Sequence, residues 1–139
     1  MVILLESATD SDVIAAVEDW LRLLERGDYH TAAVEIDSPP GGVWTPELLR
    51  RCVNYHSDLD DHRVTLTGVS RDRVIGGSLC VDTQRKDLER TPEPNDGEEL
   101  HEVWYDLYID GFNSDLTATF RLVRVPQGLA LRLYDICVR

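Results

Sequence analysis

The first part of the chain carries large apolar residues at helical spacing. In residues 9–28, TDSDVIAAVEDWLRLLERGD, the recurring positions are Val13, Val17, Trp20, Leu21 and Leu24. This spacing places them on one side of an α-helix. Thr9 and Asp12 have the spacing of a capping box, and Gly27 fits a left-handed helix stop. The pattern predicts an amphipathic helix that ends at Arg26.

Two shorter helices are predicted to follow. In residues 28–36, DYHTAAVEI, Asp28 is a suitable cap, and the apolar face comprises Tyr29, Ala32, Ala33 and Ile36. The stretch DSPPGG at 37–42 then breaks the chain. In residues 44–56, WTPELLRRCVNYH, Thr45 is a cap and Pro46 occupies the first helical position. The buried stripe of this third helix is predicted to be Leu48, Leu49, Cys52 and Val53.

After His56 the apolar period changes to two, which is typical of strands. RVTLTGVS at 63–70 alternates and predicts a strand, and SLCVDTQR at 78–85 is a weaker strand pattern. Residues 86–99, KDLERTPEPNDGEE, combine two prolines, a glycine and dense charge, so we expect a mobile loop there. This loop is not expected to divide the chain, because neither side would bury a core alone.

The last part of the chain predicts a long antiparallel hairpin system. LHEVWYDLYIDG at 100–111 alternates, with His101, Val103, Tyr105, Leu107 and Ile109 on one face. A second alternating run contains Leu116, Ala118, Phe120 and Leu122. A third follows the turn at 125–128, VPQG, and contains Leu129, Leu131 and Leu133. We expect Asp115 near the turn that starts its strand and Asp135 at the margin of the sheet, in a direction that a bulge would change.

Helices followed by a run of antiparallel strands indicate an α+β fold. We expect residues 1–139 to form a single domain, with the N-terminal helices packed on one face of a curved antiparallel sheet. A bent sheet wrapped around a long first helix would give a cone-like, cystatin-like roll. The outer face of the sheet would then be left to water or to a partner.

Charge and cysteine content exclude several classes of protein. The chain has 14 basic and 26 acidic residues, a net charge of -12, which would repel nucleic acids and anionic membrane surfaces. Three widely spaced cysteines, Cys52, Cys80 and Cys137, fit neither a disulfide framework nor a zinc site, so we expect a reducing cytoplasm. The start, MVILLESATDSD, lacks a basic segment and is too short for a membrane span, so we expect an extended arm.

One face of the strand at 100–111 is the candidate site. Glu102, Trp104, Asp106, Tyr108 and Asp110 alternate with the apolar positions. Aromatic residues ringed by acids suit a partner rich in Arg and Lys, so we expect a basic protein to bind here. In the alternative, Trp104 packs beneath the long loop or within a homodimer across the sheet.

The order of elements resembles the nuclear transport factor 2-like, or cystatin-like, superfamily. The resemblance is carried by ERGDYHTAA at 25–33, WTPELLRRCVNYH at 44–56, SDLTATFRL at 114–122 and LRLYDICV at 131–138. These stretches look most like a branch of small stand-alone bacterial proteins seen among actinobacteria. The resemblance implies the cone-like fold. The superfamily contains isomerase-like enzymes, ligand-binding domains, dimerisation modules and immunity proteins that neutralise toxins.

The function expected from these observations is that of a non-enzymatic cytoplasmic binding protein, of the immunity type, that masks a basic toxin through its acidic sheet face. We assign no catalytic residue, no cofactor and no metal: His56 and His62, near SDLDD at 57–61, lack a ligand pattern. The alternative is a small-ligand binder or isomerase-like enzyme with an Asp base and Tyr hydroxyls in the cone pocket. Its candidate groups are Tyr29, Tyr55, Tyr105, Asp106, Tyr108, Asp115, Tyr134 and Asp135.

Overall fold

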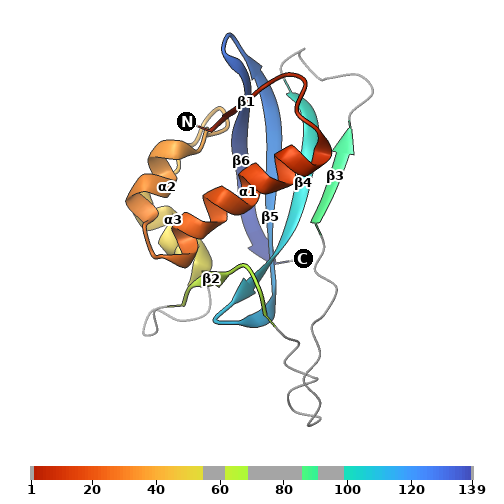
Figure 1. The fold of residues 1–139 in the computed structure, drawn as a ribbon. Helices are drawn as coiled ribbons and strands as arrows, with labels where there is room; N and C mark the ends of the chain where they lie inside the picture. Colours follow the sequence, from red (N-terminus) through yellow and green to blue (C-terminus); the bar gives the residue numbers. More distant parts are fainter. Residues whose placement is uncertain (1, 55–61, 69–85, 91–98, 139) are drawn as a thin grey trace.

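A computed structural model of the chain describes residues 2–54, 62–68, 86–90 and 99–138. In these ranges three helices pack on one side of a strongly curled antiparallel sheet (Figure 1). The helices are α1 (Asp10–Glu25), α2 (Tyr29–Glu35) and α3 (Pro46–Val53). The strands are β1 (Ile3–Leu4), β2 (Val64–Thr65), β3 (Lys86–Arg90), β4 (Glu99–Ile109), β5 (Phe112–Val125) and β6 (Gly128–Val138). The predicted α+β class with helices on one face of a curved sheet is confirmed.

Within the described residues, the sheet is built around one long meander. The strand order is β1-β6-β5-β4-β2, and β3 pairs with a different part of the same β4 edge. Figure 1 shows α1 crossing the concave side of β4, β5 and β6, with α2 and α3 beside the β6 edge. Asp37 extends that edge through a parallel bridge to Arg132. The helical layer therefore covers the concave face.

The helix ends follow the local capping signals in the sequence. Thr9 and Asp12 form the predicted capping box of α1, and Gly27 follows the helix with a positive φ of 73°. Asp28 caps α2 by accepting a hydrogen bond from Thr31 N. Thr45 caps α3 in the same way, and Pro46 lies where its missing N–H is harmless. These ends are determined by contacts within a few residues.

The core fills the space between the helices and the concave face. Trp20, Tyr105 and Phe120 are its largest fully buried side chains. The indole of Trp20 donates a hydrogen bond of 3.0 Å to Ala32 O, and its ring meets Phe120 edge-on at 5.6 Å. The predicted core rows of β5 and β6 are buried, as are the β4 residues of the same face that the structure describes, which are Val103, Tyr105, Leu107 and Ile109. The side chains of His101 and Asp115 lie outside the described part.

The structure corrects three sequence-based expectations. The predicted loop at 86–99 begins with a strand, because Lys86–Arg90 pair with residues 101–105 of β4. Backbone pairing at an available sheet edge has overridden a polar local sequence here. Of the strand predicted at 63–70, residues 63–68 are described, and within them the strand is limited to Val64–Thr65. Leu48 is 40% exposed rather than buried. Residues 78–85 and 91–98 lie outside the described part.

The predicted N-terminal arm is present and is tied to the sheet. Its strand β1 pairs with Leu129 and Ala130 of β6, and Val2 N donates a hydrogen bond of 2.8 Å to Glu35 O at the end of α2. No helix in the described ranges has both the length and the apolar character needed to cross a membrane.

Candidate functional site: the outer face of the sheet

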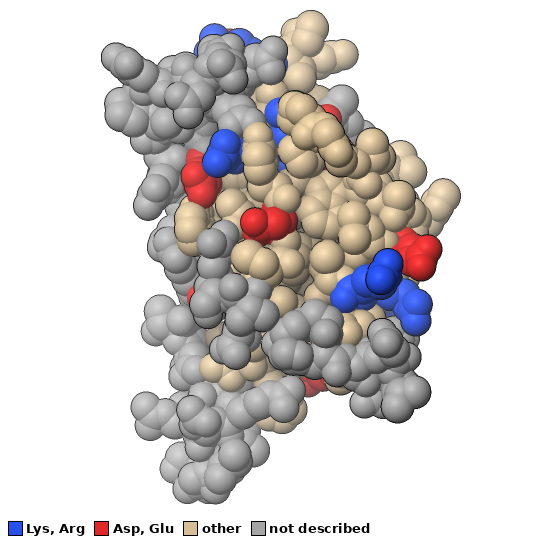
Figure 2. All heavy atoms as spheres, turned by 180° about the vertical axis from the view of Figure 1, so that it is seen from behind, with Lys and Arg blue, Asp and Glu red and all other residues tan. Residues whose placement is uncertain are grey.

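The outer, convex face of the sheet carries the polar positions of β4 and their neighbours on β5 and β6. Cross-strand pairing places Glu102 beside Arg121, Trp104 beside Thr119 and Asp106 beside Thr117. Figure 2, which views the molecule from behind, shows mainly uncharged side chains here, with acidic groups beside basic ones at its margins and one acidic group alone near the middle. The acidic face expected from β4 alone is therefore diluted by its neighbouring strands.

A β-bulge in β6 brings two further side chains to this face. The register shifts between Thr119, which pairs with Asp135, and Phe120, which pairs with Leu133, so Tyr134 is the additional residue. The guanidinium carbon of Arg121 lies 4.3 Å from the centroid of the Tyr134 ring, which is cation–π geometry. Asp135 is exposed. Alternation alone left open which face of the sheet Asp135 lies on. The bulge places it on the outer face.

The acidic groups on this face are held by short polar contacts. Thr117 Oγ1 donates a hydrogen bond of 2.9 Å to Asp106 Oδ1, and Cys137 Sγ donates one of 3.3 Å to Asp135 Oδ1. Glu102 Oε2 lies 4.0 Å from Arg121 Nη2. Each of the three carboxylates therefore has a polar neighbour within the protein.

Trp104 is half-buried at the centre of this face. Its cross-strand neighbour on β5, Thr119, is only 5% exposed, and Thr117 is only 3% exposed, although both belong to the outer row. The middle of this face is therefore covered from solvent at both threonines. We call the set Glu102, Trp104, Asp106, Arg121, Tyr134 and Asp135 the outer-face cluster.

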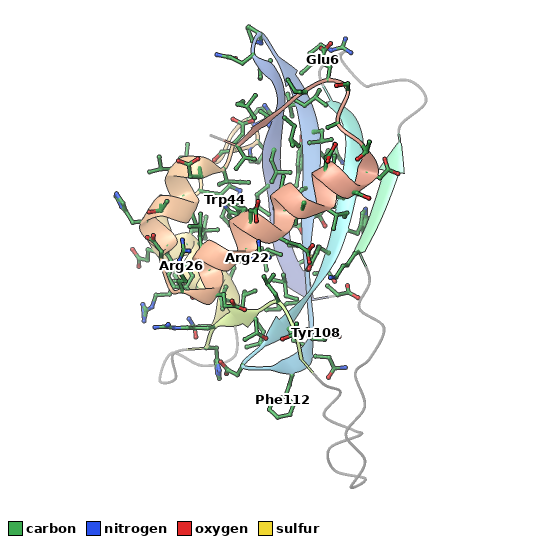
Figure 3. The ribbon with its side chains drawn as sticks, viewed as in Figure 1. Glu6, Arg22, Arg26, Trp44, Tyr108 and Phe112 are labelled. Atoms are coloured by element: carbon green, nitrogen blue, oxygen red, sulfur yellow. The ribbon has the colours of Figure 1, made fainter. Side chains whose placement is uncertain are left out.

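The structure brings together only three of the five residues that sequence predicted as a partner site. Glu102, Trp104 and Asp106 lie on the outer face. Tyr108 is 3% exposed, and a Cβ on Gly68 would come within 2.9 Å of its ring, so the ring packs beneath that glycine. Figure 3 shows Tyr108 beside the β4–β5 turn, near Phe112 and far from Glu6 on the arm.

Asp110 lies in the turn after β4 rather than on the strand face. It has a positive φ of 53°, and its carboxylate accepts a hydrogen bond of 3.0 Å from Arg63 N. The other carboxylate oxygen lies 2.5 Å from His62 Nδ1. These contacts join the turn to the segment before β2, so Asp110 has a structural part in addition to any part in binding.

Sequence reasoning did not propose Arg121 as a site residue, and it considered Tyr134 only for a pocket inside the cone. A signal for Arg121 was present, because it alternates with the buried Phe120 and Leu122 and must therefore face outward. The same signal was present for Tyr134, which follows the buried Leu133, whereas the direction of Asp135 depends on the bulge. At the edge of the face, Arg132 Nε binds Asp37 Oδ2 at 2.6 Å, and that arginine is 13% exposed.

A second polar cluster lies on the helix side of the sheet. Tyr105 OH donates a hydrogen bond of 2.8 Å to Glu18 Oε2, and Lys86 Nζ binds the same oxygen at 3.0 Å. The lysine ammonium also lies 5.2 Å from the centroid of the Tyr105 ring. This cluster borders a groove of about 420 Å³ whose other lining residues are Asp10, Ser11, Ile14 and Ala15.

The two acidic groups of this cluster respond oppositely to their surroundings. Burial disfavours ionisation of Glu18, but the hydrogen bond from Tyr105 and the charge of Lys86 outweigh it and lower the pKa of Glu18. Burial, and next the hydrogen bond to Glu18, raises the pKa of the Tyr105 hydroxyl far above its ordinary value. The cluster therefore consists of a carboxylate, a neutral phenol and an ammonium.

The inside of the cone is occupied by side chains of the main core. Of the eight groups considered for a cone pocket, Tyr105 lies in this core with its hydroxyl on Glu18, whereas Tyr134 and Asp135 lie on the outer face. Asp106 also lies outside, and Tyr55 is outside the described residues. Among the described side chains no three His, Cys, Asp or Glu residues gather as metal ligands. His56 and SDLDD at 57–61 lie outside that part.

Comparisons of the chain with protein-family models, with curated proteins and with solved structures find no match.

Proposed function

We propose that this protein is a non-enzymatic binding protein whose outer-face cluster recognises a basic protein partner. The observation that carries the proposal is the stack of Arg121 on Tyr134, at 4.3 Å, on the same face as the half-buried Trp104. Aromatic residues and Arg are enriched at protein interfaces and dominate their binding energy.

The charges of the cluster support a basic partner. Glu102, Asp106 and Asp135 outnumber the single Arg121, and the whole chain has a net charge of -12. Such a field accelerates encounter with a positively charged surface and weakens as salt screens it. A like-charged partner, including nucleic acid, would be repelled.

We further propose that the protein belongs to the nuclear transport factor 2-like superfamily and acts in the cytoplasm as an immunity-type protein that masks a basic toxin. The order of helices and curled sheet supports the superfamily, and the three acidic residues of the outer-face cluster support the partner. A homodimer across the same face is the competing use of this surface.

A pull-down from the native cell tests the proposal. We expect the tagged protein to retain a basic protein in stoichiometric amount at low salt and to release it as salt rises. The variants Trp104→Ala and Arg121→Ala should each weaken binding by about tenfold or more, as expected for interface anchors. Arg124→Ala is the matched control, because it removes another β5 arginine, paired with Glu6 at 3.2 Å.

Two results would contradict the proposal. One is that the protein stays alone at every salt concentration. The other is that Trp104→Ala and Arg121→Ala retain the partner as well as Arg124→Ala does. Light scattering on the pure protein distinguishes partner binding from homodimerisation. If the protein is a homodimer and Trp104→Ala dissociates it, the outer face serves self-association.

A small-ligand function of the isomerase-like type is the second candidate. The observation in its favour is the pairing of a neutral phenol, Tyr105, with a carboxylate, Glu18, beside the groove of about 420 Å³. In this function Glu18 would act as the base, and Tyr105, whose proton Glu18 accepts in the free protein, would turn that proton to a substrate carbonyl. Thermal-shift screening with small cyclic ketones tests it: a ligand whose stabilisation is lost in Tyr105→Phe would support it, and no stabilisation by any ketone would exclude it.

A further inference from the structure

A second groove lies between the N-terminal arm and helix α1. It has a volume of about 480 Å³, within the range of ligand sites, and it is open along its length. Figures 1 and 3 show how it arises: the arm that carries Glu6 and the helix that carries Arg22 diverge from the start of α1. We call it the arm–helix groove. It faces away from the outer-face cluster, which lies on the opposite side of the sheet.

Both walls of the arm–helix groove are anchored. The arm is held by the pairing of β1 with β6 and by the ion pair of Glu6 with Arg124 at 3.2 Å. Ala8 N donates a hydrogen bond of 3.0 Å to Leu5 O, which closes the turn into α1. The opposite wall is the helix itself. A groove with two fixed walls loses little conformational freedom when a ligand binds.

The groove is lined by both apolar and polar surface and is partly open to solvent. The arm contributes Ile3, which is 37% exposed, and Leu5, which is 74% exposed. The helix contributes the small side chains of Ala15 and Ala16. Adjacent exposed apolar side chains in a concave site gain free energy when an apolar group covers them.

The negative charge on the helix wall of the groove favours a ligand that carries positive charge. Asp12 and Asp19 lie on this wall, seven positions apart in sequence and therefore about 10 Å apart along the helix axis. Asp12 accepts a hydrogen bond of 2.9 Å from Thr9 N, and Asp19 is paired with the exposed Arg22. A carboxylate has further acceptor positions beyond one such contact. Both acids can therefore take a cation from a ligand.

The spacing of the acids matches an extended chain. A strand-like peptide advances about 3.3 Å per residue, so about 10 Å corresponds to roughly three residues. Side chains two to four residues apart in such a peptide would reach both carboxylates, because Arg and Lys have long flexible stems. Ala15 also borders the groove next to Glu18, which lies on a different face of α1.

We propose that the arm–helix groove binds an extended segment of a protein partner in which an aliphatic side chain is flanked by Arg or Lys. The aliphatic side chain covers Leu5 and Ala15, and the cations contact Asp12 and Asp19. This site goes beyond the proposed function, because it uses none of the outer-face cluster.

Selection from a random peptide library displayed on phage tests the inference with the full chain as the immobilised target. We expect the enriched peptides to combine an aliphatic residue with at least two Arg or Lys. For an enriched peptide, measured by fluorescence anisotropy, Ala15→Trp should weaken binding by about tenfold or more because it fills the groove. Asp19→Lys should weaken it by about fivefold or more through charge reversal.

Matched controls separate the groove from general effects. Val34→Trp places the same side chain on the exposed surface of α2, and Glu47→Lys makes the same charge change on α3. Both should leave the affinity unchanged. Trp104→Ala should also leave it unchanged, which distinguishes this site from the outer-face cluster. The inference is overturned if no peptide is enriched above an unrelated acidic protein, if enriched peptides lack cations, or if Ala15→Trp binds them as the unmodified chain does.

Discussion

Glu18 and Tyr105 connect helix α1 to the middle of the sheet through a hydrogen bond of 2.8 Å between the phenol and Oε2 of the carboxylate. The same oxygen binds Lys86 Nζ at 3.0 Å, so one atom of α1 is joined to both β4 and β3. Tyr105 is 1% exposed, so its hydroxyl depends on Glu18 as acceptor. The contact therefore fixes the position of the helix on the concave face.

Removing the Glu18 carboxylate should destabilise the fold. Glu18→Ala leaves the buried hydroxyl of Tyr105 without this acceptor, and we expect a loss of about 2 kcal/mol in the free energy of unfolding. Glu18→Gln keeps an acceptor oxygen at the same place and should cost less than half of that. Urea denaturation measures both. Equal losses for the two variants would mean that the hydrogen bond from Tyr105 does not matter.

The same carboxylate should contribute to the pH dependence of stability. Its pKa is lower in the folded chain than the ordinary value of 4.5, so the folded state favours the ionised form. The resulting stabilisation is present above the unfolded pKa and is lost as the pH falls through the folded pKa. We expect the unmodified chain to lose more stability than Glu18→Gln between about pH 6 and about pH 3. Urea midpoints at several pH values measure this difference, and parallel curves would contradict it.

Gly128 should be far less replaceable than Gly41. Both have positive φ, 144° for Gly128 and 91° for Gly41, so alanine is strained at either position. A Cβ at Gly128 would also lie 2.3 Å from the carbonyl oxygen of Leu4, whereas one at Gly41 meets nothing within 4 Å. We expect Gly128→Ala to cost at least about 2 kcal/mol more than Gly41→Ala. Chemical denaturation of both variants tests this, and similar losses would show that β1 does not hold its place beside Gly128.

Asp110 should be required for stability rather than only for binding. Asp110→Ala removes the acceptor for Arg63 N and the contact with His62 at a position with φ 53°, so we expect a loss of about 2 kcal/mol. Asp110→Asn tolerates this backbone and keeps an acceptor oxygen, so its loss should stay below about 1 kcal/mol. Thermal and urea unfolding measure both. No loss in Asp110→Ala would remove the structural role.

Much of the architecture was predictable because its signals are local. The capping box of Thr9 with Asp12 and the left-handed Gly27 act within a few residues of their own helix end. The alternation of Leu116, Ala118, Phe120 and Leu122 determines which side of β5 is buried. The outward row of Glu102, Trp104 and Asp106 followed from the same alternation. These features depend on the backbone period, which a single segment of sequence contains.

Tertiary contacts determined which residues from distant parts of the sequence become neighbours. Lys86–Arg90 became a strand because the edge of β4 was available, and Tyr108 became buried because Gly68 passes over its ring. The bulge at Tyr134 places Asp135 on the outer face, and Tyr105 found its acceptor 87 positions away in the chain. Each of these features depends on residues that are distant in sequence. The apolar period of a single segment contains no information about which distant residue will contact it in the folded chain.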